Sequence, residues 1–346
     1  MGERLSEREE AILFGLLATY IKTHEPVGSR TLADEVPERL SPATIRNILA
    51  RLETMGYLSQ PHASAGRVPT DLSYRYLARR IVAHLQGEDE PAPDAVEALV
   101  RGGSLNAVAR HLTTLLADSA HTVGFAVTPP LEVVKLRCCD LVSMGDSRVL
   151  CVVVSEVGQV HEKVLWPDRM YDPEQLRWFS NYLNETYAGL SFWEIRRRLR
   201  AAVEDESTRC HHRVMEAVRL VSPYFLAEGP PRDLFWEGAT WLVEGLQSGE
   251  DLAGARRLLE SLEKKTRLLD FLEDLLGDGR PVQVVIGDDW PDPEVHTLAM
   301  VAAPFGDEAK GLGCVGVIGP KPLSYERVIP TVRRAARLAT LASSKL

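Results

Sequence analysis

The sequence predicts a multidomain α+β protein whose N-terminal domain is a winged helix-turn-helix. Its 346 residues correspond to two or three domains of ordinary size. Residues 6–69 contain three helix-like segments followed by a hairpin-like segment. Farther along, short strand-like runs joined by tight turns are interrupted by a helix-rich stretch, which indicates an antiparallel sheet with an insertion.

The first two helices are predicted over about 6–24 and 29–34. Ser6 and Glu9 have the spacing of a capping box. The first helix has one apolar stripe, formed by Ile12, Leu13, Leu16, Leu17, Tyr20 and Ile21. A long helix, a short helix, a turn and a third helix reproduce the helix-turn-helix order.

The third helix is predicted to enter a DNA groove. Ser41 is a suitable N-cap, and Pro42 falls at the first helical position, where its missing N–H costs nothing. One face is apolar, with Ile45, Ile48 or Leu49, Leu52 and Met55, and the other carries Thr44, Arg46, Asn47 and Arg51. Arginine pairs with guanine, asparagine pairs with adenine, and the threonine methyl contacts thymine. The helix alone also fits an amphipathic helix with solvated arginines, but the order of the helices favours DNA binding.

A β-hairpin wing is predicted after Gly56, with strands at 57–60 and 67–69. Small side chains at its tip allow close approach to a phosphate backbone. We expect two groups of DNA contacts. The phosphate backbone of the DNA should be positioned by Arg30, Ser64, Gly66 and Arg67. Bases or adjacent phosphates should be contacted by Thr44, Arg46, Asn47, Arg51 and the cap residue Ser41. The next helix, from Thr70 to about Leu85, carries Arg75, Arg79 and Arg80, for which a solvated face is favoured over phosphate contacts.

Several segments resemble the bacterial heat-inducible transcription repressors that act on chaperonin and chaperone operons. They are EPVGSRTLA (25–33), LSPATIRN (40–47), QPHASAGRVPT (60–70), YRYL (74–77), GVIGP (316–320) and SYERVI (324–329). The resemblance implies a homodimeric repressor that binds double-stranded operator DNA at an inverted repeat, is released on heat stress and has a chaperonin as modulator. Ile48 stands where that family usually has an acidic residue, and Ser73 where it usually has glycine.

The same resemblance implies a GAF-like α+β domain with an inserted, mainly helical dimerisation domain. We place the winged helix at 1–86, an acidic, proline-bearing linker at 87–103, the GAF-like domain at 104–166 and 234–346, and the insertion at 167–233. Strand-like runs are 122–128, 134–142, 148–154, 160–165, 282–286, 297–303 and 314–318. A leucine-rich helix over 251–276 is expected to pack in a core. The aromatic residues of the insertion fit an interface or a core equally well: Trp178, Phe179, Tyr182, Phe192 and Trp193.

Composition limits the class of protein. Hydrophobic and charged fractions of 45% and 26% are those of a globular chain. The net charge is −9, yet residues 37–86 carry seven arginines against three acidic residues, so the basic footprint of a DNA-binding protein is local. Five cysteines without a C-x-x-C pair indicate a reducing compartment. With no signal peptide or membrane span predicted, we expect a cytoplasmic protein.

Other motifs are not interpreted as sites. Gly311, Gly313 and Gly316 match G-x-G-x-x-G, but a strand and a proline follow, so a hairpin turn is the better explanation. Neither the run 210–212 (Cys-His-His) nor the acidic set Asp288, Asp289 and Asp292 has clear ligand geometry. No catalytic residues, cofactor or metal are expected, and an enzyme is disfavoured. The alternative function is a winged-helix regulator that senses a small molecule.

Overall fold

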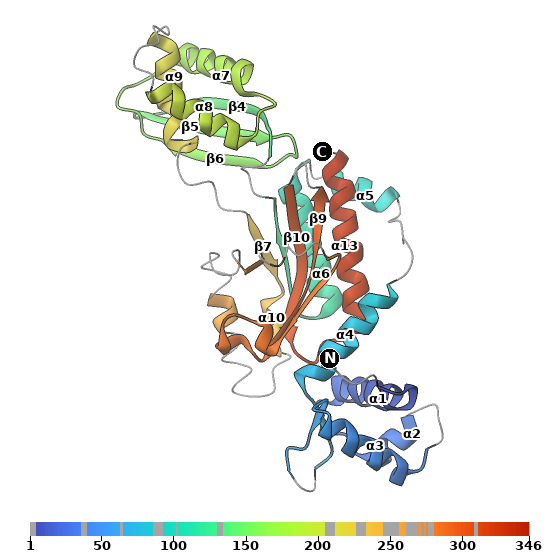
Figure 1. The fold of residues 1–346 in the computed structure, drawn as a ribbon. Coiled ribbons are helices and arrows are strands. Elements are labelled where there is room, and N and C mark those ends of the chain that lie inside the picture. Colours follow the sequence, from blue (N-terminus) through green and yellow to red (C-terminus); the bar gives the residue numbers. More distant parts are fainter. Residues whose placement is uncertain are drawn as a thin grey trace.

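The computed structural model describes residues 5–35, 40–62, 65–85, 93–101, 103–129, 134–204, 212–225, 233–244, 256–260, 269, 271–272, 275, 280–307 and 311–345. The chain forms three bodies in a row: an N-terminal domain, a central sheet domain and an insertion that lies at the far end from the N-terminal domain (Figure 1). No helix of the described residues is both long and apolar enough to cross a membrane.

The N-terminal domain has the predicted helix order. It contains α1 (Glu7–Thr23), α2 (Ser29–Glu35), α3 (Pro42–Thr54), β1 (Leu58–Ser59) and β2 (Val68–Pro69). The capping box of Ser6 and Glu9 is present at the start of α1. The apolar stripes of α1 and α3 meet in a core that includes Ile12, Leu16, Ile45 and Leu52, all fully buried. β1 and β2 pair antiparallel, and a bridge between Val27 and Arg67 widens the base of this wing.

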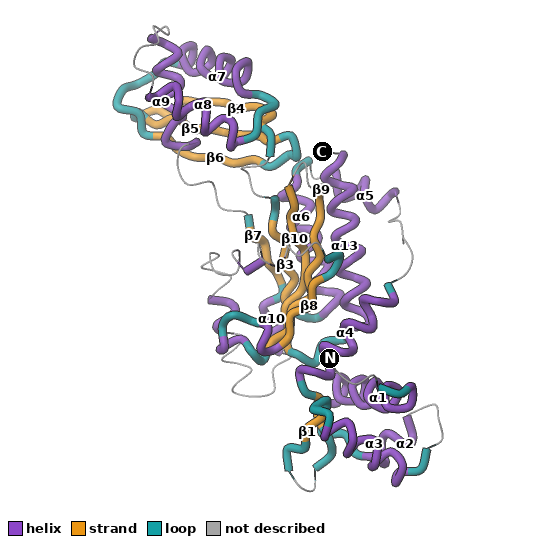
Figure 2. The backbone as a smooth tube through the Cα atoms, viewed as in Figure 1, coloured by secondary structure: helices purple, strands orange, loops and turns teal. Residues whose placement is uncertain are grey.

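The central domain is built on one antiparallel sheet of order β7-β3-β10-β9-β8. These strands are Leu234–Glu237, Val123–Val127, Gly311–Pro320, Leu298–Asp307 and Gln283–Ile286. Helices α6 (Leu105–Ala120) and α13 (Tyr325–Lys345) cover one face (Figures 1 and 2), with α5 (Pro93–Val100) beside α13. A second cluster of buried side chains, which includes Leu258, Leu272 and Trp290, packs with Phe125, Met300 and Ile318 of the sheet.

The sequence predicts a hairpin turn at the glycines of the G-x-G-x-x-G motif, but they lie within β10. Gly313 and Gly316 pair with Phe305 and Ala302 of β9. The strand continues to Pro320, so no helix begins where a dinucleotide site would need its N-terminus. Short connecting elements complete the domain: α10 (Ala239–Glu244) and the 3₁₀ turns at Gly287–Asp289 and Pro293–Val295. Most of the leucine-rich segment 251–276 lies outside the described residues.

The insertion contains strands that we had assigned to the central sheet. β4 (Leu136–Gly145), β5 (Arg148–Ser155) and β6 (Val160–Leu165) form a separate three-stranded antiparallel sheet. Helices α7 (Pro173–Tyr187), α8 (Phe192–Glu204) and α9 (His212–Phe225) cover one of its faces. The reason is packing: inward side chains such as Leu141 and Val153 share a buried cluster with helical residues such as Phe179 and Leu199. The described insertion therefore spans 134–225 and is itself α+β.

The aromatic residues of the insertion divide between core and surface. Phe179 and Phe192 are buried in the cluster just described. Trp178 stacks on Tyr182, with ring centroids 5.7 Å apart, and both Trp178 and Trp193 are exposed. Because some of these rings are buried in the core between helices and sheet and others are exposed, the aromatics do not form a single surface.

Helix α4 (Asp71–His84) joins the N-terminal domain to the central domain. It begins directly after the wing and packs beside α13 and β8 (Figure 1). Tyr74 and Leu77 of α4 belong to one continuous buried cluster, which extends from α1 to Tyr325 and Ile329 of α13. The two domains thus share a core across α4.

Candidate nucleic-acid interface

Helix α3 is held so that one face is buried and the other is open to solvent. Ser41 caps it, since the Ser41 hydroxyl accepts a hydrogen bond from the Thr44 amide at 3.1 Å. The Ser41 hydroxyl also lies 2.9 Å from the Thr44 hydroxyl. Ser41 therefore has a structural role that explains its place in the motif without any contact to DNA.

The exposed face of α3 has the chemistry of base recognition. Thr44, Arg46 and Asn47 are all exposed, and the exposed alanines Ala43 and Ala50 lie on the same side of the helix. The small alanines leave the helix backbone free to approach a groove, while the arginine and asparagine supply bidentate donors. This face can therefore read the edges of bases.

Arg51 lies at the border of this face and is also part of the support for α3. Its Nε is 3.0 Å from Oε1 of Glu9, the capping-box carboxylate of α1, which is only 7% exposed. The Ser6 backbone and hydroxyl, and then the Arg51 guanidinium, hold the pKa of Glu9 below its usual value despite burial. Arg51 thus ties α3 to α1, while its side chain is still 62% exposed and open to an anion.

The base of the wing is built by two of the residues predicted to contact phosphate. The Arg67 side chain forms an ion pair with Glu53 of α3 at 2.8 Å, and the Arg67 backbone exchanges two hydrogen bonds of 2.9 Å with Val27. A Cβ at Gly66 would lie 2.5 Å from the Val27 carbonyl carbon, so only glycine allows this approach. The main role of Gly66 and Arg67 in the structure is therefore to hold the base of the wing. Ser64 lies outside the described residues, and Arg30 is exposed on α2.

The structure also shows a junction that the sequence did not predict, where the wing runs into α4. The Tyr57 carbonyl, next to β1, accepts hydrogen bonds from the Thr70 hydroxyl at 2.9 Å, from the Thr70 amide at 3.0 Å and from the Ser73 hydroxyl. Ser73 is fully buried, so its hydroxyl is matched to this carbonyl. The wing is thereby fastened to the first turn of α4.

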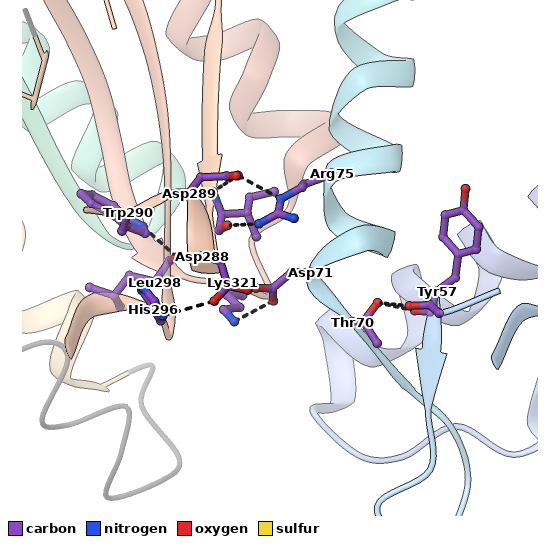
Figure 3. Close-up of polar contacts among 12 residues, drawn as sticks. Tyr57, Thr70, Asp71, Arg75, Asp288, Asp289, Trp290, His296, Leu298 and Lys321 are labelled. Carbon is purple, nitrogen blue, oxygen red and sulfur yellow. Dashed lines mark hydrogen bonds and ion pairs between the residues drawn. The ribbon is translucent and has the colours of Figure 1, made fainter. Parts of the chain in front are cut away.

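The first turns of α4 are in turn fastened to the central domain (Figure 3). Lys321 Nζ lies 2.6 Å from Asp71 Oδ1, and Arg75 Nε lies 2.9 Å from Asp289 Oδ2. Arg75 Nη2 also donates to the Ile286 carbonyl at 3.0 Å, and the rings of Tyr74 and Tyr325 are 5.9 Å apart. We call these contacts the α4 joint.

Two observations show how closely the α4 joint fits. Gly287 has φ +59°, and a Cβ there would lie 1.7 Å from Asp71 Oδ2. Tyr325 is fully buried, and burial beside Tyr74 and Asp71 raises the pKa of its hydroxyl well above the ordinary value. The hydroxyl donates to the Lys321 carbonyl at 2.9 Å, which satisfies it as a neutral group.

The sequence analysis favours a solvated face for the arginines of α4, but two of the three form ion pairs. Arg75 belongs to the α4 joint, Arg80 pairs with Glu10 of α1, and Arg79 is exposed. Asp289, which we had considered as part of an acidic metal set, serves the joint instead, and Asp288 faces His296 at 3.2 Å. Among the described residues, no group of three potential metal ligands is found, and Cys210 and His211 lie outside them.

Comparison with known proteins identifies the family. A model described as "Winged helix-turn-helix transcription repressor, HrcA DNA-binding" matches residues 4–82, and one described as "HrcA protein C terminal domain" matches residues 106–329. The chain belongs to the HrcA family. A Heat-inducible transcription repressor HrcA of Xanthomonas euvesicatoria pv. vesicatoria (strain 85-10) is 35% identical over 336 residues, covering 96% of this chain and 94% of the relative. One from Xylella fastidiosa (strain M12) is 32% identical over 334 residues, covering 96% and 95%.

A solved structure supports the fold assigned to this HrcA-family chain. The structure, titled "Crystal structure of a hypothetical protein at 2.2 A resolution", matches with a TM-score of 0.65 and 21% identity, covering 99% of this chain and 100% of the other. The departures from the family pattern are accommodated within it. Ile48 is half-buried and packs against the core, and Ser73 bonds Tyr57.

Proposed function

We propose that this HrcA-family chain binds an inverted-repeat operator of chaperonin or chaperone genes as a homodimer and releases it on heat stress. The observation that carries the proposal is the exposed face of α3, where Arg46 and Asn47 project beside small alanines on a helix that is capped and buried on its opposite side. Such a face fits the major groove.

The contacts to DNA are proposed in two groups. Arg46, Asn47 and Thr44 read base edges, while Arg51 and Arg30 contact phosphates on either side. The wing, held at its base by Gly66 and Arg67, brings its tip to the phosphate backbone. This assignment keeps Ser41, Gly66 and Arg67 as residues that position the reading surface.

The outer face of the insertion sheet supports the homodimer. On this face Val142, Leu150 and Val164 form one cross-strand row, and a second row contains Val154 and Val160. Val142, Val160 and Val164 are 51%, 47% and 37% exposed. A sheet face with this much exposed valine fits a second copy of itself, and twofold symmetry then presents two α3 helices to two half-sites.

The α4 joint supports release by heat. Its two ion pairs are partly exposed to solvent, and they accompany the apolar contact that α4 makes with α13 through Tyr74 and Tyr325. Because a folded protein is only marginally stable, such a joint can open over a narrow temperature range without a dedicated heat sensor. Opening would expose Tyr74 and Tyr325, apolar surface of the kind that chaperones bind, which supports the chaperonin as modulator.

An electrophoretic mobility shift tests the operator proposal. The DNA is the promoter region of the host's chaperonin operon, with a scrambled duplex beside it at the same salt concentration. We expect specific retardation that Arg46→Ala/Asn47→Ala abolishes and that Lys22→Ala, the loss of an exposed positive charge on α1, leaves nearly unchanged. Equal retardation of both duplexes by the wild type would refute sequence-specific reading.

A further inference from the structure

A cavity of about 410 Å³ lies between α4 and the edge strand β8, away from the DNA-reading face of α3. Five residues of α4 line it at helical spacing: Arg75, Ala78, Arg79, Val82 and Ala83. The facing wall is the segment 282–286, with Leu275, Arg280 and Asp289. The cavity is therefore bounded on one side by the helix that follows the wing and on the other by the central sheet.

The cavity has an apolar floor and a positive rim. Ala78, Val282 and Val285 are buried and present only aliphatic groups. Of the described residues that line the cavity, three are arginines and one, Asp289, is acidic. Within the described part of the chain, Arg79 and Arg280 are exposed and have no ion-pair partner, so the rim carries uncompensated positive charge.

The open edge of β8 adds backbone groups to the same cavity. The Ile286 amide donates to Asp289 Oδ2 at 3.1 Å, and the Ile286 carbonyl accepts from Arg75 at 3.0 Å. Both groups of Ile286 therefore point away from β9, the paired neighbour. In an antiparallel strand the N–H and C=O of one residue point to the same side, and this side alternates from one residue to the next. Val284, two residues before Ile286, therefore also presents its N–H to the cavity. A carboxylate held there has a backbone donor in addition to the guanidinium groups.

The geometry favours a small ligand over an added β-strand. β8 has only four residues, and Arg75 already occupies the Ile286 carbonyl that a pairing strand would need. Helix α4 also runs beside this edge, where Figure 3 shows Arg75 reaching across to Asp289. An extended peptide would have to displace both, whereas a small anion fits between them.

We propose that this cavity binds an amphipathic organic carboxylate, with its apolar body on the valine floor and its carboxylate between Arg79, Arg280 and the Val284 amide. Such a ligand would touch α4 and β8 together, so it would stabilise the docked arrangement of the α4 joint. Its binding does not depend on the proposed repressor function; only its effect on operator affinity rests on that function, through reciprocal linkage.

Calorimetric titration of the full-length chain with octanoate tests the proposal. We expect saturable binding with a Kd below about 1 mM, within reach of a ligand of this size, and a rise in Tm. Octanol, which has the same chain without the charge, and acetate, which has the charge without the chain, should bind far more weakly. The variant Arg79→Gln/Arg280→Gln should weaken octanoate binding at least about tenfold, the effect of one lost charge-assisted hydrogen bond.

Two further variants make the titration decisive. Ala83→Trp places a large side chain in the cavity and leaves its charges in place, so it should block octanoate binding while circular dichroism and the ligand-free Tm confirm folding. Arg101→Gln removes an exposed arginine outside the cavity and should bind as the wild type does. No binding of octanoate up to about 10 mM, equal binding of octanol, or unchanged binding by both cavity variants would each overturn the proposal.

The operator assay without ligand separates this inference from the proposed function. Specific retardation of the operator with no octanoate binding would support the proposed repressor function and refute the ligand site. The opposite result is octanoate binding that the cavity variants abolish, in a chain that does not retard the operator. It would support the ligand site and refute the proposed operator binding.

Discussion

Glu9 connects the cap of α1 to the arginine at the edge of the reading face. Its carboxylate accepts from the Ser6 amide and from the Ser6 hydroxyl, each at 2.8 Å, and pairs with Arg51 at 3.0 Å. These contacts favour the ionised form, so the pKa of Glu9 is lowered in the folded state. One carboxylate therefore serves both the first helix and the third.

The lowered pKa of Glu9 predicts a pH dependence that Glu9→Gln removes. A carboxyl whose folded-state pKa is depressed adds stability above its unfolded pKa and loses it as the pH falls through the folded value. The wild type should thus be more stable than Glu9→Gln at pH 7, with a constant difference down to about pH 5 that shrinks below about pH 4.5. Urea unfolding of the wild type and of Glu9→Gln at several pH values between about 4 and 7 measures this difference in unfolding free energy. A difference that does not change with pH would contradict the role of charge.

Gly66 carries a second prediction at this scale. The Cβ of Gly66→Ala would meet the Val27 backbone at 2.5 Å, so the bridge that holds the base of the wing has to shift. We expect a loss of about 1–3 kcal/mol in unfolding free energy, the usual cost of forcing an atom into a packed site. Operator affinity should fall as well, although α3 is untouched. Denaturant unfolding and mobility shifts measure both, and Gly28→Ala, where the added Cβ meets nothing within 4 Å, is the matched control.

At the scale of elements, the sequence predicts the N-terminal domain well because its signals are local. Ser41, Pro42 and the Ser6/Glu9 pair mark helix ends within four residues of the groups that they cap. The α4 joint could not be found in this way. Arg75 and Asp289 are 214 positions apart, and Asp71 and Lys321 are 250 apart, so no local pattern relates them.

The border of the insertion was missed for a different physical reason. β4, β5 and β6 are joined by short turns, and such hairpins have the same alternation of apolar and polar residues whichever sheet they enter. Only packing decides, and Leu141 and Val153 pack with the helices of the insertion. The reading face of α3 is still a prediction from side-chain chemistry, while the roles of Gly66 and Arg67 required coordinates.

The ion pair of Asp71 and Lys321 predicts how strongly α4 is docked. Both side chains are about one quarter exposed, so their coupling should lie near the upper end of the range for partly solvated pairs, about 1 kcal/mol. A double-mutant cycle with Asp71→Asn and Lys321→Gln, measured by urea unfolding, gives this value. The same variants should release the operator at a lower temperature than the wild type. Release at an unchanged temperature would detach the α4 joint from heat control.

At the scale of the whole molecule, the three bodies divide the tasks of a repressor. The N-terminal domain holds the reading face at one end, the insertion presents its exposed sheet face at the other, and α4 links the first to the central domain (Figure 1). The net charge of −9 belongs to this division, since residues 1–86 sum to +1. The acidic remainder repels DNA and thereby limits contact to the N-terminal domain.

The exposed valines of the insertion sheet give the prediction that tests this division. Val142→Asp/Val164→Lys places one charge on each side of Leu150 in one cross-strand row, where both stay solvated in the monomer but are costly to bury against a second copy. We expect a folded monomer by size-exclusion chromatography with light scattering, and an operator affinity at least about a hundredfold lower because one half-site contact is lost. Leu115→Asp, which changes an exposed leucine on α6, is the control and should remain dimeric. A variant that stays dimeric and binds the operator normally would move the dimer contact elsewhere on the chain.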